Sequence, residues 1–103
     1  MSYNLLISKE AHDDTSGIVG YIVHKLKNPQ AAADFLDDVE ESYRRLIANP
    51  FLYALCNDPR LERRGYRKVV INNYLILYRI DEEHKTVYIV RIVYGGRNYS
   101  EML

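Results

Sequence analysis

The spacing of the apolar residues changes once along this chain, close to Pro59, and this change constrains the fold most. Before Pro59, apolar residues recur at helical spacing, and after it they gather in runs of Val, Ile and Tyr that are typical of strands. The spacing predicts helices over 9–27 and 30–48 and strands over 3–8, 66–71, 74–80 and 86–94. The predicted order is therefore β-α-α-β-β-β.

Asparagine and proline mark several of the predicted boundaries. Asn28-Pro29 predicts the start of the second helix, because Asn caps a helix and Pro suits its first position. Asn49-Pro50 predicts its end, since the residue before a proline avoids the helical region. Asn72-Asn73 predicts a tight hairpin turn, because Asn tolerates a positive φ. Residues 51–65 show no clear period and are predicted to form a connecting loop.

Two helices followed by a β-meander predict an α+β fold, in which a two-helix N-terminal hairpin packs on a small antiparallel sheet. The length of 103 residues predicts a single domain over 1–103. Hydrophobic residues make up 48% and charged residues 27%, a composition that excludes a disordered chain. No apolar run reaches the ~18 residues that a membrane span needs, and no signal peptide is evident. We therefore expect a soluble, cytoplasmic protein that does not engage membranes.

Several kinds of chemistry are not expected from this sequence. The single Cys56 excludes an internal disulfide and a CxxC-type zinc site. His12, His24 and His84 do not stand at metal-ligand spacing. The sequence also has no phosphate-binding P-loop, no GxGxxG motif and no serine nucleophile elbow. Neither a metal ion nor a cofactor is therefore expected.

The net charge of zero hides an uneven distribution of charge. Residues 1–59 hold 5 basic and 9 acidic side chains, whereas residues 60–103 hold 9 basic and 5 acidic ones. Arginine dominates the second half, and its planar guanidinium suits phosphates and carboxylates. The basic end could bind a polyanion or an acidic protein segment. Ordinary solvated surface charge is the alternative interpretation.

Alternation along the strands predicts which side chains share a face of the sheet. Arg79 and Arg91 are expected on one face, which we predict to be open to solvent, with Arg97 at the rim. A two-residue turn at 72–73 adds Lys68 to this face, whereas a longer or bulged turn adds Arg67. The apolar residues expected with the arginines are Leu75, Leu77, Val87, Ile89 and Val93. Those expected beneath the helices are Tyr88, Val90, Ile92 and Tyr94. Solvated, snorkelling arginines remain an alternative to an anion-binding face.

Five segments taken together, in their order and spacing, resemble the RelE/ParE superfamily of toxins. They are residues 28–32, 46–50, 65–70, 73–80 and 87–97. The resemblance implies the fold of that superfamily and a toxin of a bacterial type II toxin–antitoxin system. It also implies a cognate antitoxin whose flexible segment wraps the toxin and neutralises it. The target is left open, because ribosome-dependent mRNA endonucleases and gyrase inhibitors share this fold.

The RelE-like endonucleases match this chain at two of four positions. Arg67 follows the tyrosine of the second strand and Arg97 follows the last strand, as in those enzymes. Where they have an arginine in the third strand and a tyrosine near the C-terminus, this chain has Leu75 and Leu103. If the chain is a ribonuclease, the resemblance implies Arg67, Arg97 and Tyr99 as its catalytic residues.

The ParE-like branch is more similar, because it shares the Gly-Tyr-Arg-Lys stretch at 65–68 and the glycine–arginine end of the last strand. The resemblance implies growth inhibition through binding of a target such as DNA gyrase. Lys68, Arg79 and Arg91, together with Arg67 and Arg97, are then expected to contact the target or the antitoxin. A ribosome-dependent mRNA endonuclease and a non-toxic protein-interaction module are the alternatives.

Overall fold

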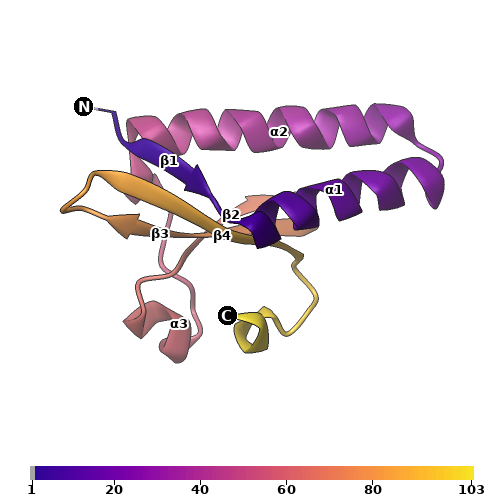
Figure 1. The fold of residues 1–103 in the computed structure, drawn as a ribbon. Coiled ribbons are helices and arrows are strands. Elements are labelled where there is room, and N and C mark those ends of the chain that lie inside the picture. Colours follow the sequence, from indigo (N-terminus) through magenta and orange to yellow (C-terminus); the bar gives the residue numbers. More distant parts are fainter. Residues whose placement is uncertain (1) are drawn as a thin grey trace.

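The computed structural model describes residues 2–103, with two long helices on one side of a four-stranded sheet (Figure 1). A short helix and the C-terminus lie on the other side of the sheet. The elements are β1 (Asn4–Ile7), α1 (Lys9–His24), α2 (Pro29–Ala48), a 3-10 helix (Pro50–Leu52), α3 (Pro59–Arg63), β2 (Arg67–Ile71), β3 (Tyr74–Asp81), β4 (Thr86–Tyr94) and a second 3-10 helix (Tyr99–Met102). The predicted α+β class and element order are confirmed.

The sheet has the strand order β1-β4-β3-β2 and is mixed. β2, β3 and β4 form an antiparallel meander, but β1 pairs with β4 in parallel. The prediction of a wholly antiparallel sheet is therefore wrong for its first strand. Parallel strands need a long crossover connection, and here the two helices and the first two strands of the meander supply it.

The two long helices begin at side-chain caps. The hydroxyl of Ser8 accepts a hydrogen bond from the N–H of Ala11 at 2.9 Å, and the Asn28 side chain accepts one from the N–H of Ala31 at 3.0 Å. The predicted start of α2 at Asn28-Pro29 is thus confirmed. α1 ends at His24, earlier than predicted, because Lys27 adopts a φ of 51° and the chain turns there into the next cap.

The prediction that residues 51–65 form only a loop is wrong, because they contain α3 and part of a 3-10 helix. Asp58 caps α3 by accepting from the N–H of Arg60 at 2.9 Å, and Pro59 occupies the first helical position. This is the same local signal as Asn28-Pro29. Leu61, on α3, is 1% exposed and fixes this helix to the sheet.

The turn between β2 and β3 has two residues, as predicted from Asn72-Asn73. Ile71 pairs with Tyr74, and Asn72 adopts a φ of 51°. This register places Lys68 opposite Leu77, so Lys68 joins the Leu77 face, as expected for a two-residue turn.

A β-bulge in β4 changes which of its side chains face the helices. Tyr78 pairs with Ile89 but Leu77 pairs with Arg91, which leaves Val90 as the extra residue. Arg79 and Arg91 therefore share the face of Leu77, as predicted. The assignments of four other residues are wrong, because alternation along β4 is broken at the bulge. Val87 and Ile89 belong to the helix-side core, and Tyr88 and Val90 do not lie beneath the helices.

Both faces of the sheet are covered. On one face, α1 and α2 pack over Ile76, Tyr78 and Ile92. The opposite face holds a second buried cluster, so the prediction of an open face is wrong there. This second cluster consists of Cys56, Leu61, Tyr66, Leu75, Leu77 and Val93, with Val90, Tyr99, Met102 and Leu103 packed against it. Among residues 2–103, no helix is long and apolar enough to cross a membrane.

Candidate functional site

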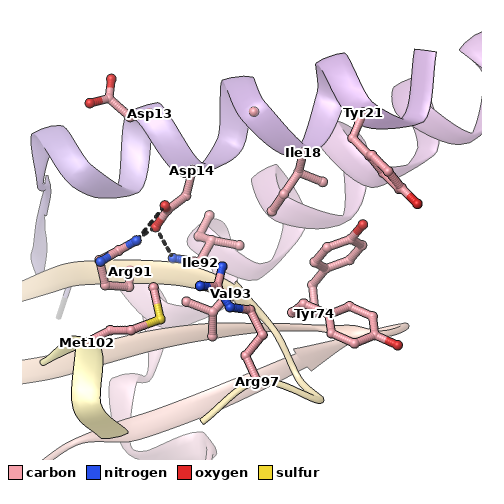
Figure 2. A pocket seen from close by; sticks show the side chains of 12 residues that line it. Asp13, Asp14, Ile18, Tyr21, Tyr74, Arg91, Ile92, Val93, Arg97 and Met102 are labelled. Atoms are coloured by element: carbon pink, nitrogen blue, oxygen red, sulfur yellow. Dashed lines mark hydrogen bonds and ion pairs between the residues drawn. The ribbon is translucent and has the colours of Figure 1, made fainter. Parts of the chain in front are cut away.

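A cavity of about 630 Å³ opens between α1, the second half of β4 and the C-terminal residues (Figure 2). Two of the residues expected to act in binding or catalysis, Arg91 and Arg97, line this cavity. The other lining residues are Asp13, Asp14, Gly17, Ile18, Tyr21, Tyr74, Ile92, Val93, Tyr94 and Met102. The cavity therefore combines aromatic rings and aliphatic side chains with charged groups at its borders.

The cavity forms because β1 is shorter than β4. The pairing of the two strands ends at Ile7 and Ile89, so β4 continues without a strand neighbour on that side. Ser8 occupies part of this edge, donating from its N–H to the carbonyl of Ile89 at 3.0 Å and from its hydroxyl to that of Val90 at 2.7 Å. The side chain of Asp14 accepts from the N–H of Ile92 at 3.0 Å. The edge is thus closed by α1 and its cap.

Arg91 forms an ion pair inside the fold. Its Nε and Nη2 donate to the two carboxylate oxygens of Asp14 at 2.7 and 2.9 Å, in the bidentate geometry that makes such pairs strong. Both side chains are mostly buried, with 22% of Arg91 and 15% of Asp14 exposed. The hydrogen bonds to Asp14 raise the pKa of Arg91 above its usual value.

Arg97 is the second cation of the cavity, and its surroundings differ. It is exposed, and within residues 2–103 no ion pair involves it. Two glycines lead the chain from β4 to Arg97. A Cβ at Gly96 would lie 2.7 Å from the ring of Tyr94, so any other residue at this position would displace that ring. Among residues 2–103, Arg97 is therefore the cation of this cavity that no ion pair neutralises.

The aromatic wall of the cavity continues from the helix-side core. Tyr74 packs edge-to-face against Phe35 at 5.3 Å and against Tyr94 at 6.0 Å between ring centroids. The residues Tyr21 and Tyr94 remain about half exposed, at 51% each. Tyrosine rings of this kind bury a large area on binding at a low cost in side-chain entropy.

Arg67 lies outside the cavity that Arg91 and Arg97 line. Its Nη1 donates to the carbonyl of Tyr53 at 2.6 Å, and its guanidinium stacks over the ring of Phe51 at 5.2 Å. Arg67 pairs with Tyr78, which pairs with Ile89, whereas Arg97 follows the far end of β4. The two arginines are therefore roughly 15 Å apart along the strands, from the usual rise per residue. The fold does not bring them together.

Tyr99 packs against the second buried cluster and does not line the cavity with Arg97. Burial raises the pKa of its hydroxyl. Thus, of the three residues implied for a ribonuclease, only Arg97 borders this cavity. Among residues 2–103, no group of three His, Cys, Asp or Glu side chains is arranged to hold a metal ion.

Arg79 and Lys68 lie on the face opposite the helices. The guanidiniums of Arg79 and Arg64 lie over the same ring, that of Tyr66, at 5.4 and 5.1 Å from its centroid. Within residues 2–103, neither Arg79 nor Lys68 takes part in an ion pair. Arg79 also borders a second cavity, of about 610 Å³, together with Leu6 and Tyr88.

Sequence reasoning did not single out Asp14, Tyr21 or Tyr74 as site residues. Asp14 and Arg91 are 77 positions apart, and neither residue carries a local signal of the pair. The hydroxyl of Ser8 caps α1, and its second bond, to β4, depends on the parallel strand pairing.

Comparison with known proteins places the fold among toxins of toxin–antitoxin systems. The chain is similar to the chromosomal ParDE system of P. aeruginosa, with a TM-score of 0.69 and 22% identity over 90% of this chain and 96% of that one. For the RelBE2 toxin–antitoxin complex of Mycobacterium tuberculosis, the TM-score is 0.64 with 23% identity, covering 91% and 99% of the two chains. For the intact RelBE complex of E. coli, it is 0.65 with 12% identity, covering 93% and 100%.

No curated protein sequence matches the chain. The model of one family does match, over residues 5–99, and is described as the ParE toxin of type II toxin-antitoxin system, parDE. The match includes both long helices, all of the sheet except Asn4, and Arg97. It confirms the predicted membership of the RelE/ParE superfamily, and the chain belongs to the ParE toxin family of type II toxin–antitoxin systems.

Proposed function

We propose that this ParE-family toxin inhibits bacterial growth by binding DNA gyrase, and that a cognate antitoxin neutralises it. Family membership supports the toxin, and the structural neighbours that are toxin–antitoxin complexes support the antitoxin. A gyrase target would place the protein in the cytoplasm. The observation that favours binding over RNA cleavage is the separation of the residues implied for catalysis.

Cleaving a phosphodiester without a metal requires acid–base groups and a cation at one phosphate. Here Arg67 is held by Tyr53 and Phe51 at the start of β2, level with the middle of β4, and Arg97 lies past the end of β4. Tyr99 packs against the second cluster, and the raised pKa of its hydroxyl makes this group a weaker proton donor at neutral pH. These positions support a toxin that binds its target rather than one that cuts RNA.

The cavity beside α1 is the surface we assign to the target. Arginine and tyrosine are enriched among the residues that dominate protein–protein binding energies. Arg97 has no ion-pair partner among residues 2–103, and Tyr21 and Tyr94 are half exposed beside it. Arg79 and Lys68, on the other side of the sheet, remain available to the antitoxin.

The first experiment expresses the full chain alone in bacteria and follows growth, plasmid supercoiling and the 5′ ends of cellular mRNA. We expect growth arrest with loss of gyrase supercoiling and with intact mRNA. New mRNA ends at ribosomes, with normal supercoiling, would favour the endonuclease instead. Unimpaired growth at full expression would indicate a non-toxic interaction module.

The second experiment tests the site with a matched pair of variants in a gyrase supercoiling assay. Arg97→Ala should raise the toxin concentration for half-inhibition at least about tenfold, the effect of losing one dominant contact. Arg63→Ala removes another exposed arginine with no ion pair within residues 2–103, so inhibition should stay unchanged. Full activity of Arg97→Ala would remove the cavity from the proposal.

A further inference from the structure

The bonds that Asp14 makes to β4, beyond the end of β1, assign roles to three charged residues of the cavity. We infer that Asp14 is a positioning residue, which fixes α1 as one wall of the cavity and holds Arg91 away from the partner. Arg97 is then the one cation of this cavity that contacts a target. The functional part of this inference rests on the proposed function, whereas its structural part does not.

A single carboxylate connects two walls of the cavity (Figure 2). Asp14, on α1, accepts two hydrogen bonds from the guanidinium of Arg91 and one from the N–H of Ile92. The main-chain bond is made where β4 has no neighbouring strand, because β1 has ended at Ile7. Asp14 therefore satisfies a main-chain donor and a buried cation with the same group.

The helix that carries Asp14 has a weak middle. Gly17 and Gly20 interrupt its middle, and each lowers the helix propensity relative to alanine. An added Cβ at either glycine would meet no atom within 4 Å, so close packing does not require glycine there. Gly17 lies about one turn beyond Asp14 and lines the cavity. The bonds of Asp14 hold the adjoining turn against β4.

The neighbouring residue provides a built-in control. Asp13 also lines the cavity, but its carboxylate points to solvent and pairs with Lys9 at 2.8 Å on the same helix. In that pair, 85% of Lys9 and 65% of Asp13 are exposed. Two adjacent aspartates thus differ in the direction of their side chains, and only Asp14 reaches β4.

The structural test is amide hydrogen exchange on the full chain with Asp14→Ala and Asp13→Ala. Asp14→Ala should speed exchange of the Ile92 amide at least tenfold while the Ile76 amide in central β3 keeps its rate. Asp13→Ala should leave both amides unchanged. If Ile92 keeps its protection in Asp14→Ala, or if both amides exchange faster by the same factor, the positioning role is overturned. This result does not depend on whether the chain is toxic.

The functional test uses the double variant Asp14→Asn with Arg91→Gln, which removes both charges and keeps groups that can hydrogen-bond. With Ile92 protected in this variant, gyrase inhibition should stay within about twofold of the parent chain, while Arg97→Ala still needs at least about tenfold more toxin for half-inhibition. Loss of inhibition in the double variant with Ile92 still protected would show that Arg91 contacts the target, and would overturn this assignment. If the parent chain itself does not inhibit gyrase, the proposed function has failed and the exchange result still decides the structural part.

Discussion

The two faces of the sheet bury their side chains equally but are covered in different ways. Ile76 and Leu77 are neighbours in β3, point to opposite faces and are both 0% exposed. Ile76 lies beneath helices of 16 and 20 residues, whereas Leu77 is covered by a 5-residue helix and the C-terminal residues. The polar contacts of that second cover are exposed, including Arg60 to Ser100 at 3.0 Å. Equal burial therefore does not mean equal resistance to local opening.

Replacing these two neighbours gives the largest expected effect and tests the comparison directly. Ile76→Ala should lower the free energy of unfolding by about 4 kcal/mol, because the long helices cannot close the resulting cavity. Leu77→Ala should cost about 2 kcal/mol, because the short cover can settle into the space. Urea denaturation measures both values. An equal or larger loss for Leu77→Ala would mean that the two faces are equally rigid.

A buried hydrogen bond of Tyr78 gives a second test of the helix-covered face. Its hydroxyl donates to the carbonyl of Pro50 at 2.7 Å in the buried core. Tyr78→Phe leaves that carbonyl without this donor, so the free energy of unfolding should fall by about 1 kcal/mol. An unchanged stability would show that water reaches the carbonyl of Pro50 and that this face is looser than its burial indicates.

The same residue gives the helix-covered face a pH dependence. Burial raises the pKa of Tyr78 to about 12, above the ordinary 10.0 that it has in the unfolded chain. Tyr78 therefore contributes fully to the free energy of unfolding below pH 10, and this contribution is lost as the pH rises towards 12. The reason is that the Tyr78 hydroxyl loses its proton at a lower pH in the unfolded chain than in the folded one. Tyr43 contributes in the same sense, since burial also raises its pKa to about 12. Tyr78→Phe should make the alkaline loss of stability shallower, without abolishing it.

The smallest effect is expected at the cover of the opposite face. Met102 is half-buried against the second cluster. Met102→Ala should cost about 1 kcal/mol or less, because the C-terminal residues can shift to fill the space. Limited proteolysis should cut the C-terminal segment faster while the core stays intact. A cooperative loss of the whole fold would contradict the idea of a separate, weaker cover.

Local sequence signals predicted the two long helices, the four strands and one turn. Asn28-Pro29 gave the start of α2, and the pair Asn72-Asn73 gave a two-residue hairpin that fixed the position of Lys68. The order of helices and strands followed from periodicity, which depends only on neighbouring residues. Asp58-Pro59 carried the same kind of signal for α3, although that segment was interpreted as a loop.

The candidate site was predictable only in part. Arg91 and Arg97 were expected as site residues, and both line the cavity, but the pairing of Arg91 with Asp14 was not foreseen. That pairing requires α1 to lie beside β4, which depends on where the parallel β1 ends. The aromatic wall of Tyr21 and Tyr74 likewise comes from two elements that meet only in the fold.

The sequence by itself therefore determined the succession of elements, their caps and the hairpin turn, because residues a few positions apart set these. The tertiary structure decided the bulge at Val90, the cover over Leu77 and the separation of Arg67 from Arg97. It also decided that Asp14 neutralises one arginine of the cavity, whereas the other has no ion-pair partner within residues 2–103. The physical reason is that residues far apart in the sequence must come together in the fold before a charge can be paired or a face of the sheet can be covered.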